Sequence, residues 1–500
     1  MSSPFTHGVY PEIEPTGLVT IVKANSAAIV AVGTAPVHRL SVASYAAGAY
    51  KAYVNTPLLC LSIIDAEANL GTSEYESAWS LAKCVAGFFV YAGVSPVIFI
   101  NVYDPFVHST PATYTSTVSG STAPIPVEIV AASLVVKNGA GSTTYVEGTD
   151  YLFSYNDDWT GTLTLLTTGI LAQATLSLAY DTPNPSAITD TDIIGGVDSS
   201  GNYTGLECIE LVFSKTSIVP GLLIAPDWSY NPTVAAVIKA RTYNINNQFS
   251  CDGITELDSV STTSLAAAVT WKSTNNYVDP QLQAIWPCGS LGGQLFAPEI
   301  PRCVAIVQTD AKYNGIPYVS SSNKSTFIDS VVLRGTGAEF DITDDGGVYL
   351  NSNGISTFIN YGNGWKTWGN RQSCYGPEGD TDPIDMWENV RRMAMWLGNT
   401  WVLTLKQFVD GPGNAAGVDS VVETINQFLN SLASPGVSAL LPGANCKFVP
   451  NNNQLINILD GIFIFNTAYA VPIPMETLIV QQQYDTTQLA NFIAQVGLAA

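Results

Sequence analysis

The pattern that decides the fold is clearest in residues 74–102, which read EYESAWSLAKCVAGFFVYAGVSPVIFINV. The first half predicts a helix over Glu74–Val90, because its apolar residues recur at helical spacing along one side. The second half, Val97–Val102, is a short run of apolar and β-branched residues that is typical of a buried strand. A helix that leads into a buried strand indicates an α/β fold.

The same alternation extends on both sides of this stretch. Ala27–Val32 and Leu58–Ile64 are predicted strands that precede it. After Pro185 the pattern resumes with a helical segment, a strand, a helix and two strand candidates: Cys208–Phe213, Gly221–Ile224, Pro232–Asn244, Ser250–Thr255 and Val304–Thr309. We therefore predict one α/β domain, built from residues 21–111 and 186–363, whose sheet is covered on both faces.

Residues 112–185 interrupt this pattern with short alternating segments separated by turn residues. The predicted strands are Val127–Ile129, Leu134–Val136, Tyr151–Tyr155, Gly161–Leu166 and Ala174–Tyr180. Their spacing is that of a small β-sandwich or barrel. We therefore predict an inserted β-domain whose two ends lie close together.

Residues 364–485 show the pattern of an α+β C-terminal domain. The expected elements are two amphipathic helices, Ile384–Gly398 and Gly417–Leu432, and strands at Cys446–Val449, Gly461–Val471 and Leu478–Tyr484. Residues 1–20 and 486–500 lack a periodic apolar pattern. We expect them to be arms that are extended or disordered in the monomer and ordered only in an assembly.

The composition excludes several classes of protein. The chain has 19 Lys+Arg against 41 Asp+Glu, a net charge of −22, so it lacks the basic residues that nucleic-acid binding requires. Charged residues make up 12% of the chain, compared with about 25% in an ordinary soluble domain. Depletion of charge is typical of interface cores and favours an assembly subunit. The sequence predicts no signal peptide and no membrane span, because Val85–Ile100, the most apolar stretch, is shorter than about 20 residues.

We find no motif that requires catalysis or a cofactor. The chain lacks G-x-x-x-x-G-K-[ST], H-E-x-x-H and G-x-S-x-G. Its three histidines, His7, His38 and His108, are interpreted as loop or surface residues rather than as the base of a Ser-His-Asp triad. The sequence therefore predicts no catalytic residue and no cofactor.

The cysteines and paired carboxylates also have structural interpretations. The eight cysteines contain no C-x-x-C pair, so we expect free, buried thiols, as in a protein made in a reducing cytoplasm. Asp344-Asp345 and Asp380/Asp382 lie among Gly and Pro residues and are expected in solvated turns, with weak Ca²⁺ binding as the alternative. We predict no metal site.

Several blocks of sequence resemble contractile phage tail sheath proteins. In chain order they are Phe5–Tyr10, Glu12-Ile13 and Pro15–Gly17; Gly205–Leu211 and Pro220–Pro226; Thr309-Asp310, Gly315–Tyr318 and Ser321–Lys324; Leu350-Asn351, Gly354-Ile355 and Gly364–Arg371; Asn389–Met393, Trp396–Thr400 and Gln407–Asp410. The similarity keeps the family's order over nearly the whole chain. Ser322 replaces the family's usual proline, and residues 112–185 are the least typical part.

The resemblance implies a non-catalytic, subtilisin-like α/β domain, an inserted β-domain on the outer surface and an inner C-terminal domain that faces a tube. It implies a homo-oligomer of stacked hexameric rings, linked by terminal arms that add strands to a neighbour's C-terminal-domain sheet. The implied partners are the tail tube protein, the baseplate and the tail terminator. The sheath would be assembled in the host cytoplasm, become part of the virion, and contract from a metastable extended state to drive the tube through the host envelope.

Other functions stay open at this point. One is the sheath of a related injection machine, such as a pyocin-like particle or a secretion apparatus. Another is an active subtilisin-like hydrolase, because a fold does not fix its function. A third is a static shell or surface-layer protein.

The C-terminal domain contains the densest group of basic residues: Lys366, Arg371, Arg391, Arg392 and Lys406. Because the resemblance places this domain against the tube, they are candidate tube-facing residues that would steer an acidic partner. Helical spacing predicts that at least one of Arg391 and Arg392 faces outward. The alternative is local salt bridges to Asp385 or Glu388 on the same helix.

Overall fold

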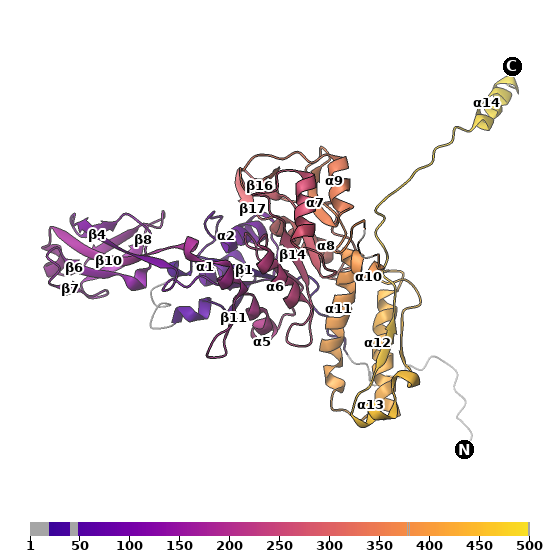
Figure 1. Ribbon diagram of the computed structural model, residues 1–500, viewed down its shortest axis with the longest axis horizontal. Helices are drawn as coiled ribbons and strands as arrows, with labels where there is room; N and C mark the ends of the chain where they lie inside the picture. Colours follow the sequence, from indigo (N-terminus) through magenta and orange to yellow (C-terminus); the bar gives the residue numbers. More distant parts are fainter. Residues whose placement is uncertain (1–19, 41–48, 378, 380, 499–500) are drawn as a thin grey trace, which may run out of the picture.

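The computed structural model describes residues 20–40, 49–377, 379 and 381–498 and shows an elongated molecule (Figure 1). A central α/β body carries a β-rich extension at one end and a helical C-terminal part at the other. The N-terminal arm expected at residues 1–20 lies outside the described residues, except for Thr20.

A nine-stranded sheet forms the centre of the body. Its six inner strands are parallel: β1 (Ile29–Gly33), β3 (Val97–Asn101), β13 (Leu222–Ile224), β14 (Asp252–Glu256), β15 (Leu282–Ile285) and β20 (Ile355–Asn360). Antiparallel strands close its edges: β2 (Pro57–Cys60), β21 (Trp365–Trp368) and β18 (Lys324–Ser325). The order is β18-β21-β20-β15-β14-β13-β1-β3-β2, and Ile29 of β1 lies in register with Leu222 and Val97.

The inner strands are buried over their whole length, except for Asn360 at the end of β20. Every residue of β1, β3 and β14 is buried, so these strands lack the alternation of a half-exposed sheet. Continuous apolar strands of this kind are typical of parallel sheets covered on both faces, as the sequence indicates. The helices of the body are α1 (Ile63–Leu70), α2 (Ser80–Val85), α4 (Asp190–Ile194), α5 (Val212–Thr216), α6 (Pro232–Thr242), α7 (Leu265–Thr274), α8 (Glu299–Lys312) and α9 (Asp344–Asn351).

Shorter elements complete the body. A π-helical segment, Ala86–Tyr91, continues α2, and a 3-10 segment, Gly205–Leu211, precedes α5. The small sheets are β17 (Gln294–Phe296)-β16 (Cys288–Leu291)-β19 (Ser330–Val332) and β11 (Gly196–Val197)-β12 (Tyr203–Thr204).

Three of the expected elements of the body differ in the structure. The strand predicted at Val304–Thr309 is wrong, because these residues lie inside α8. Residues 299–306 of this helix are all buried, which removes the polar face that would reveal a helix in the sequence. The helix predicted over Glu74–Val90 begins only at Ser80, and Leu58–Ile64 divides into the end of β2 and the start of α1. There the Ser62 side chain accepts a hydrogen bond from Asp65 N and caps the new helix.

The β-rich extension contains two small sheets over residues 109–183. The strands are β4 (Ser109–Thr117), β5 (Thr122–Ile125), β6 (Val135–Asn138), β7 (Thr144–Tyr145), β8 (Tyr151–Tyr155), β9 (Gly161–Leu165) and β10 (Thr175–Pro183). They form the sheets β4-β10-β6-β7 and β5-β9-β8. A hydrophobic core separate from that of the body holds them together. Ser109 and Pro183 pair at the base of the unit, so its two ends meet there.

The expected strands of this segment match the structure unevenly. Tyr151–Tyr155 has the bounds of β8, whereas Val127–Ile129 forms no strand. Two strands, β4 and β5, lie in the Ser/Thr-rich stretch before residue 127, where the sequence predicted none. Exposed Ser and Thr side chains on β4 weaken the alternating apolar signal there.

The C-terminal part contains long helices and a hairpin-like pair of strands. Its elements are α10 (Pro383–Met386), α11 (Glu388–Leu405), α12 (Ala415–Leu432), β22 (Asn445–Phe448), α13 (Leu455–Leu459), β23 (Phe465–Ala468) and α14 (Thr486–Leu498). The core of the body continues into α11 and α12 through Met393, Trp396 and Phe428.

The end of the chain differs from the prediction. Leu478–Tyr484 forms no strand with the described residues but belongs to an extended, exposed segment over 472–485. Residues 486–498 form the helix α14 rather than an extended arm. Figure 1 shows α14 held away from the rest of the molecule at the end of this segment.

Candidate assembly interface

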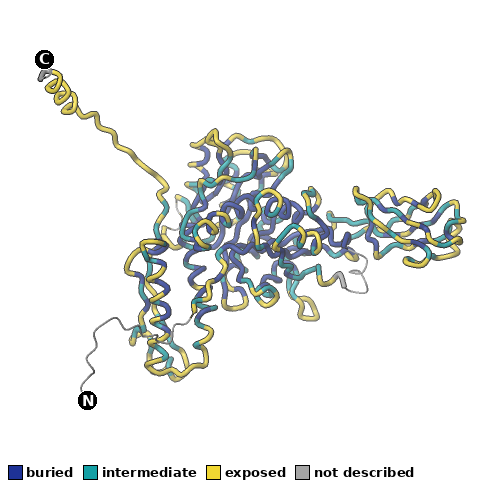
Figure 2. The backbone as a smooth tube through the Cα atoms, turned by 180° about the vertical axis from the view of Figure 1, so that it is seen from behind, coloured by how far each residue is buried: buried dark blue, intermediate teal, exposed yellow. Residues whose placement is uncertain are grey.

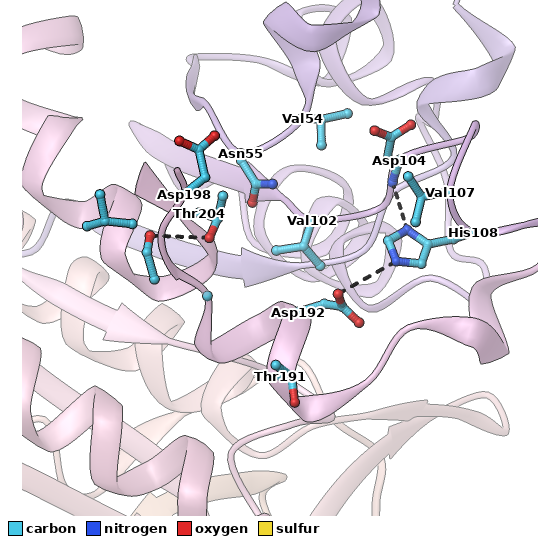
Figure 3. A pocket seen from close by; sticks show the side chains of 13 residues that line it. Val54, Asn55, Val102, Asp104, Val107, His108, Thr191, Asp192, Asp198 and Thr204 are labelled. Carbon is cyan, nitrogen blue, oxygen red and sulfur yellow. Dashed lines mark hydrogen bonds and ion pairs between the residues drawn. The ribbon is translucent and has the colours of Figure 1, made fainter. Parts of the chain in front are cut away.

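A pocket of about 440 Å³ lies beside the base of the β-rich extension (Figure 3). His108 lies in its wall, where its Nδ1 accepts a hydrogen bond from Asp104 N at 3.1 Å and its Nε2 lies 3.7 Å from Asp192 Oδ1. Among the described residues that line it, none is a serine or a cysteine. The pocket therefore pairs a histidine with carboxylates without the nucleophile that a Ser-His-Asp triad needs.

Of the other two histidines, the structure describes only His38. His7 lies outside the described residues. His38 is fully buried and not a surface residue, and its Nε2 lies 2.7 Å from Glu128 Oε1. Burial lowers the pKa of His38, although Glu128 partly opposes that change. His38 therefore serves the contact between the body and the β-rich extension.

Buried ionic groups inside the body also have internal partners. Asp227, which follows β13, forms ion pairs with Lys83 Nζ at 2.8 Å and with Arg334 at 2.6 Å. Arg334 also forms an ion pair with Glu256 at the end of β14. Burial raises the pKa of Glu256 to about 7, and Arg334 opposes this shift. These charges neutralise one another in the interior, which is the condition under which buried ions are tolerated.

The cysteines are buried as expected, whereas Asp344-Asp345 lie in the first turn of a helix rather than in a turn between elements. All eight cysteines are buried and none forms a disulfide with another, and burial raises the pKa of the Cys84 and Cys303 thiols well above the usual range. Asp344 and Asp345 open α9, and Asp382 caps α10 by accepting from Ile384 N. Within the part of the chain that is described, no cluster of three or more His, Cys, Asp or Glu residues could hold a metal ion.

The candidate tube-facing arginines do not form a basic surface. Arg392 is buried, and its guanidinium lies 2.5 Å from Asp310 and 3.4 Å from Glu388. Arg391 is half-buried and lies 2.8 Å from Asp385. Arg392 thus faces inward, whereas Arg391 is partly exposed, and the alternative of local salt bridges describes both. The sequence could not reveal that α8 brings Asp310 to this helix.

The other three candidates differ from one another. Arg371 stacks on Trp387, with its guanidinium carbon 3.4 Å from the ring centroid, and pairs with Glu476 at 2.5 Å. Lys366 on β21 is half-buried, whereas Lys406 at the end of α11 is exposed. Neither lysine forms a salt bridge with a residue that the structure describes. Of the five, only Lys366 and Lys406 keep a charge that another molecule could use.

Exposed apolar side chains occur on α13 and along the extended segment at the end of the chain, where the sequence predicted no site. The seven most exposed large apolar side chains of the described residues are Leu455, Leu459, Met475, Leu478, Ile479, Val480 and Tyr484. Figure 2 shows the segment from Met475 onward as a continuous exposed stretch that ends in α14. Apolar groups concentrated in this way mark interaction surfaces.

The strand pair β22–β23 has one blocked edge and one free edge. On β22, Cys446 N donates to Asn426 Oδ1 at 2.6 Å and Cys446 O accepts from Asn426 Nδ2 at 3.0 Å. Cys446 therefore directs its backbone groups away from β23, and the α12 side chain occupies that edge. Its register partner Thr467 directs its N–H and C=O to the outer edge of β23, where no described residue bonds to them. Such an edge can accept a further strand.

Comparisons with known proteins agree with an assembly function. No protein-family model matches the chain. The chain is 28% identical over 510 residues to the tail sheath protein of Burkholderia phage BcepMu, an alignment that covers 98% of each protein. The resemblance to tail sheath proteins that the motifs indicated is therefore confirmed.

Solved structures of contractile sheaths are similar to this chain in fold. The PVC sheath complex of an extracellular contractile injection system, in its contracted state, has a TM-score of 0.58 and 13% identity, covering 98% of this chain and 100% of that one. The contracted helical sheath of the anti-feeding prophage has a TM-score of 0.55 and 13% identity, covering 97% of this chain and 100% of that one. The mixed α/β, multi-sheet architecture is thus similar to that of contractile sheaths.

Proposed function

We propose that this chain is the structural subunit of a contractile tail sheath. Its similarity to a tail sheath protein runs over nearly its whole length, and its fold is similar to that of contracted sheaths. The observation that carries the proposal is the exposed apolar segment at the C-terminus, because a chain that stayed monomeric would leave this surface in water. The function is assembly rather than catalysis.

The subunits would polymerise helically, in stacked hexameric rings, around an inner tail tube. The parallel sheet of the body supports a non-catalytic, subtilisin-like α/β domain at the centre of each subunit. The free edge of β23 supports linkage by strand addition, in which a neighbour's terminal arm contributes main-chain hydrogen bonds. Residues 1–20 would form a second arm of this kind. The tail tube protein, the baseplate and the tail terminator would be the further partners.

Contraction would convert a metastable extended lattice into one with more complementary contacts. The subunit is suited to move as a rigid body, because α11 shares the core of the body and is fixed to it by buried ion pairs such as Arg392–Asp310. The flexible connections would be the arms, so the lattice can rearrange while each fold is preserved. The motion would drive the tube through the host envelope.

The three parts of the molecule would occupy different radii of the sheath. The C-terminal part would face the tube, with Lys366 and Lys406 as the remaining basic contacts to it. The β-rich unit over residues 109–183 would form an inserted domain on the outer surface. Its separate core and its position at the far end of the molecule from the C-terminal part support this (Figure 1).

The location of the assembled protein follows from the same proposal. The subunits would assemble in the host cytoplasm and become part of a virion tail. Eight buried cysteines without a disulfide among them are compatible with a reducing compartment. No described helix is both long enough and apolar enough to cross a bilayer.

Electron microscopy of the purified full-length protein tests the proposed function. Hollow tubes of uniform width, formed from the protein alone or around added tail tubes, are the expected result. Flat sheets, closed shells or persistent monomers under both conditions would contradict a tail sheath. The presence of genes for a capsid in the same cluster would distinguish a phage tail from another contractile injection machine.

A further inference from the structure

The terminal helix α14 presents an apolar face that no described residue covers. Leu489, Phe492, Ile493 and Val496 follow the i, i+3, i+4, i+7 spacing of one helix face and are 48–63% exposed. Residues 486–498 contain no charged side chain. A helix of 13 residues is marginal on its own in water, so this one needs a surface to pack on.

A second uncovered apolar surface lies on α13 and the loop that follows it. We define the α13 patch as Leu455, Ile456, Leu459 and Ile462, which are 50–74% exposed. No residue of α13 is buried, and Asp460 is the sole charge between residues 450 and 464. An uncharged helix and a nearly uncharged patch can be joined without leaving a buried charge unpaired.

The two surfaces do not meet within one molecule. The chain is held to the body at Glu476 by Arg371, and residues 477–485 then extend by at most about 30 Å. Both views of the molecule show this segment leaving near α10 and running away from α13, which lies at the opposite end of the C-terminal part (Figures 1 and 2). With the chain running in this direction, the α13 patch open to α14 is that of a second copy.

The free edge of β23 explains how the α14 helix of one copy would come to lie beside the α13 patch of another. If residues 478–484 add antiparallel to β23, their C-terminal end lies toward Phe465, where that strand begins. The loop before Phe465 leads directly from α13. Because α14 begins two residues after Tyr484, this strand direction delivers the helix to the α13 patch.

We propose that α14 of one copy packs its apolar face on the α13 patch of a second copy and acts as a helical anchor for the arm. This inference rests on the proposed sheath function and adds the partner surface of its C-terminal arm. A lipid surface fits less well, because interfacial membrane helices carry Lys or Arg on their polar face and α14 has none.

Cysteine crosslinking tests the contact directly. Full-length Leu459→Cys and Phe492→Cys variants are mixed and oxidised, with the parent chain and each variant alone as controls. The native cysteines are buried, so they should give little background. We expect a covalent dimer only in the mixture. No dimer in the mixture, or a crosslink within one chain of the double variant, would overturn the inference. The contact needs only two copies, so this result does not depend on tube formation.

A charge substitution on each side of the contact gives the second test. Phe492→Asp should raise the protein concentration needed for polymers at least about tenfold, which corresponds to about 1.4 kcal/mol per contact. Asn491→Asp, which adds the same charge to the opposite face of α14, is the matched control and should have little effect. Leu459→Lys combined with Phe492→Asp should restore part of the loss. Normal tubes from Phe492→Asp would refute the anchor and leave the sheath function standing, whereas an unaltered chain that never polymerises would argue against the sheath function itself.

Discussion

A buried ion pair between Arg392 of α11 and Asp310 of α8 holds the C-terminal helices to the body. The Arg392 guanidinium is 2% exposed and lies against Asp310, which is 3% exposed. We expect Arg392→Leu to lower the free energy of unfolding by about 3–5 kcal/mol, because it leaves an unpaired buried carboxylate. Arg391→Leu, one residue away in a half-buried pair, should cost about 1 kcal/mol or less. Chemical denaturation measures both, and a double Arg392→Leu, Asp310→Leu variant that recovers none of the loss would contradict this account.

A buried carboxylate makes the stability depend on pH. Burial raises the pKa of Asp252 to about 6, although hydrogen bonds from Gln283 and Gln372 and the charge of Arg392 oppose this. Because the folded-state pKa lies above the unfolded value, the favourable contribution of Asp252 is complete below about pH 3.9 and is lost as the pH rises through about 6. Because of Asp252, the free energy of unfolding of the unaltered protein should fall by on the order of 2–3 kcal/mol between pH 4 and 7, and Asp252→Asn should abolish this fall. If the free energy of unfolding changes with pH by the same amount in both proteins across this range, the prediction is wrong.

The blocked edge of β22 can be opened by one substitution. Asn426 on α12 binds both backbone groups of Cys446. We expect Asn426→Ala to cost about 1–3 kcal/mol of stability, because two partly buried backbone groups lose their partner. It should also create a second free edge, which hydrogen exchange would reveal as faster exchange at Cys446 with little change at Thr467. Unchanged exchange at Cys446 would show that the Asn426 side chain does not protect this edge.

The sequence predicted elements well where the local pattern matches the burial. The bounds of β8 and the end of α12 agree, because alternation or a helical stripe separates a buried from an exposed side. Val304–Thr309 was misread because α8 is buried on several sides. The arginine cluster was misread because its partners, such as Asp310, are distant in sequence. The helical spacing of Leu489, Phe492, Ile493 and Val496 is present in the sequence, so the expectation that residues 486–500 lack a periodic apolar pattern is wrong.

The elongated molecule contains two hydrophobic cores rather than one. The core of the body extends into α11 and α12, whereas the β-rich unit has its own core. The contact between the two parts includes a small polar cluster and the Trp159 ring, which stacks on Arg39. Glu128 lies 2.7 Å from His38 and 2.5 Å from Arg39, and the Tyr155 hydroxyl donates to His38 O at 3.3 Å. This division means that the body should fold without the extension.

Deletion of residues 109–183, with a short glycine linker in their place, tests this division and the position of the extension in the sheath. The deletion should be tolerated because Asn184 N already donates to His108 O at 3.0 Å, so the ends to be joined are adjacent. We expect a folded protein that loses about 1–3 kcal/mol, since Arg39 keeps its pair with Glu76 but loses Glu128. Glu128→Gln in the full-length protein, which removes only the charge of this side chain, should also lower the free energy of unfolding, but by less.

If the extension is external, the protein without it should still form tubes, and electron microscopy should show a smaller outer diameter and an unchanged inner diameter. A folded protein without tubes would place the extension in a subunit contact, and failure to fold would show that the two cores are not independent.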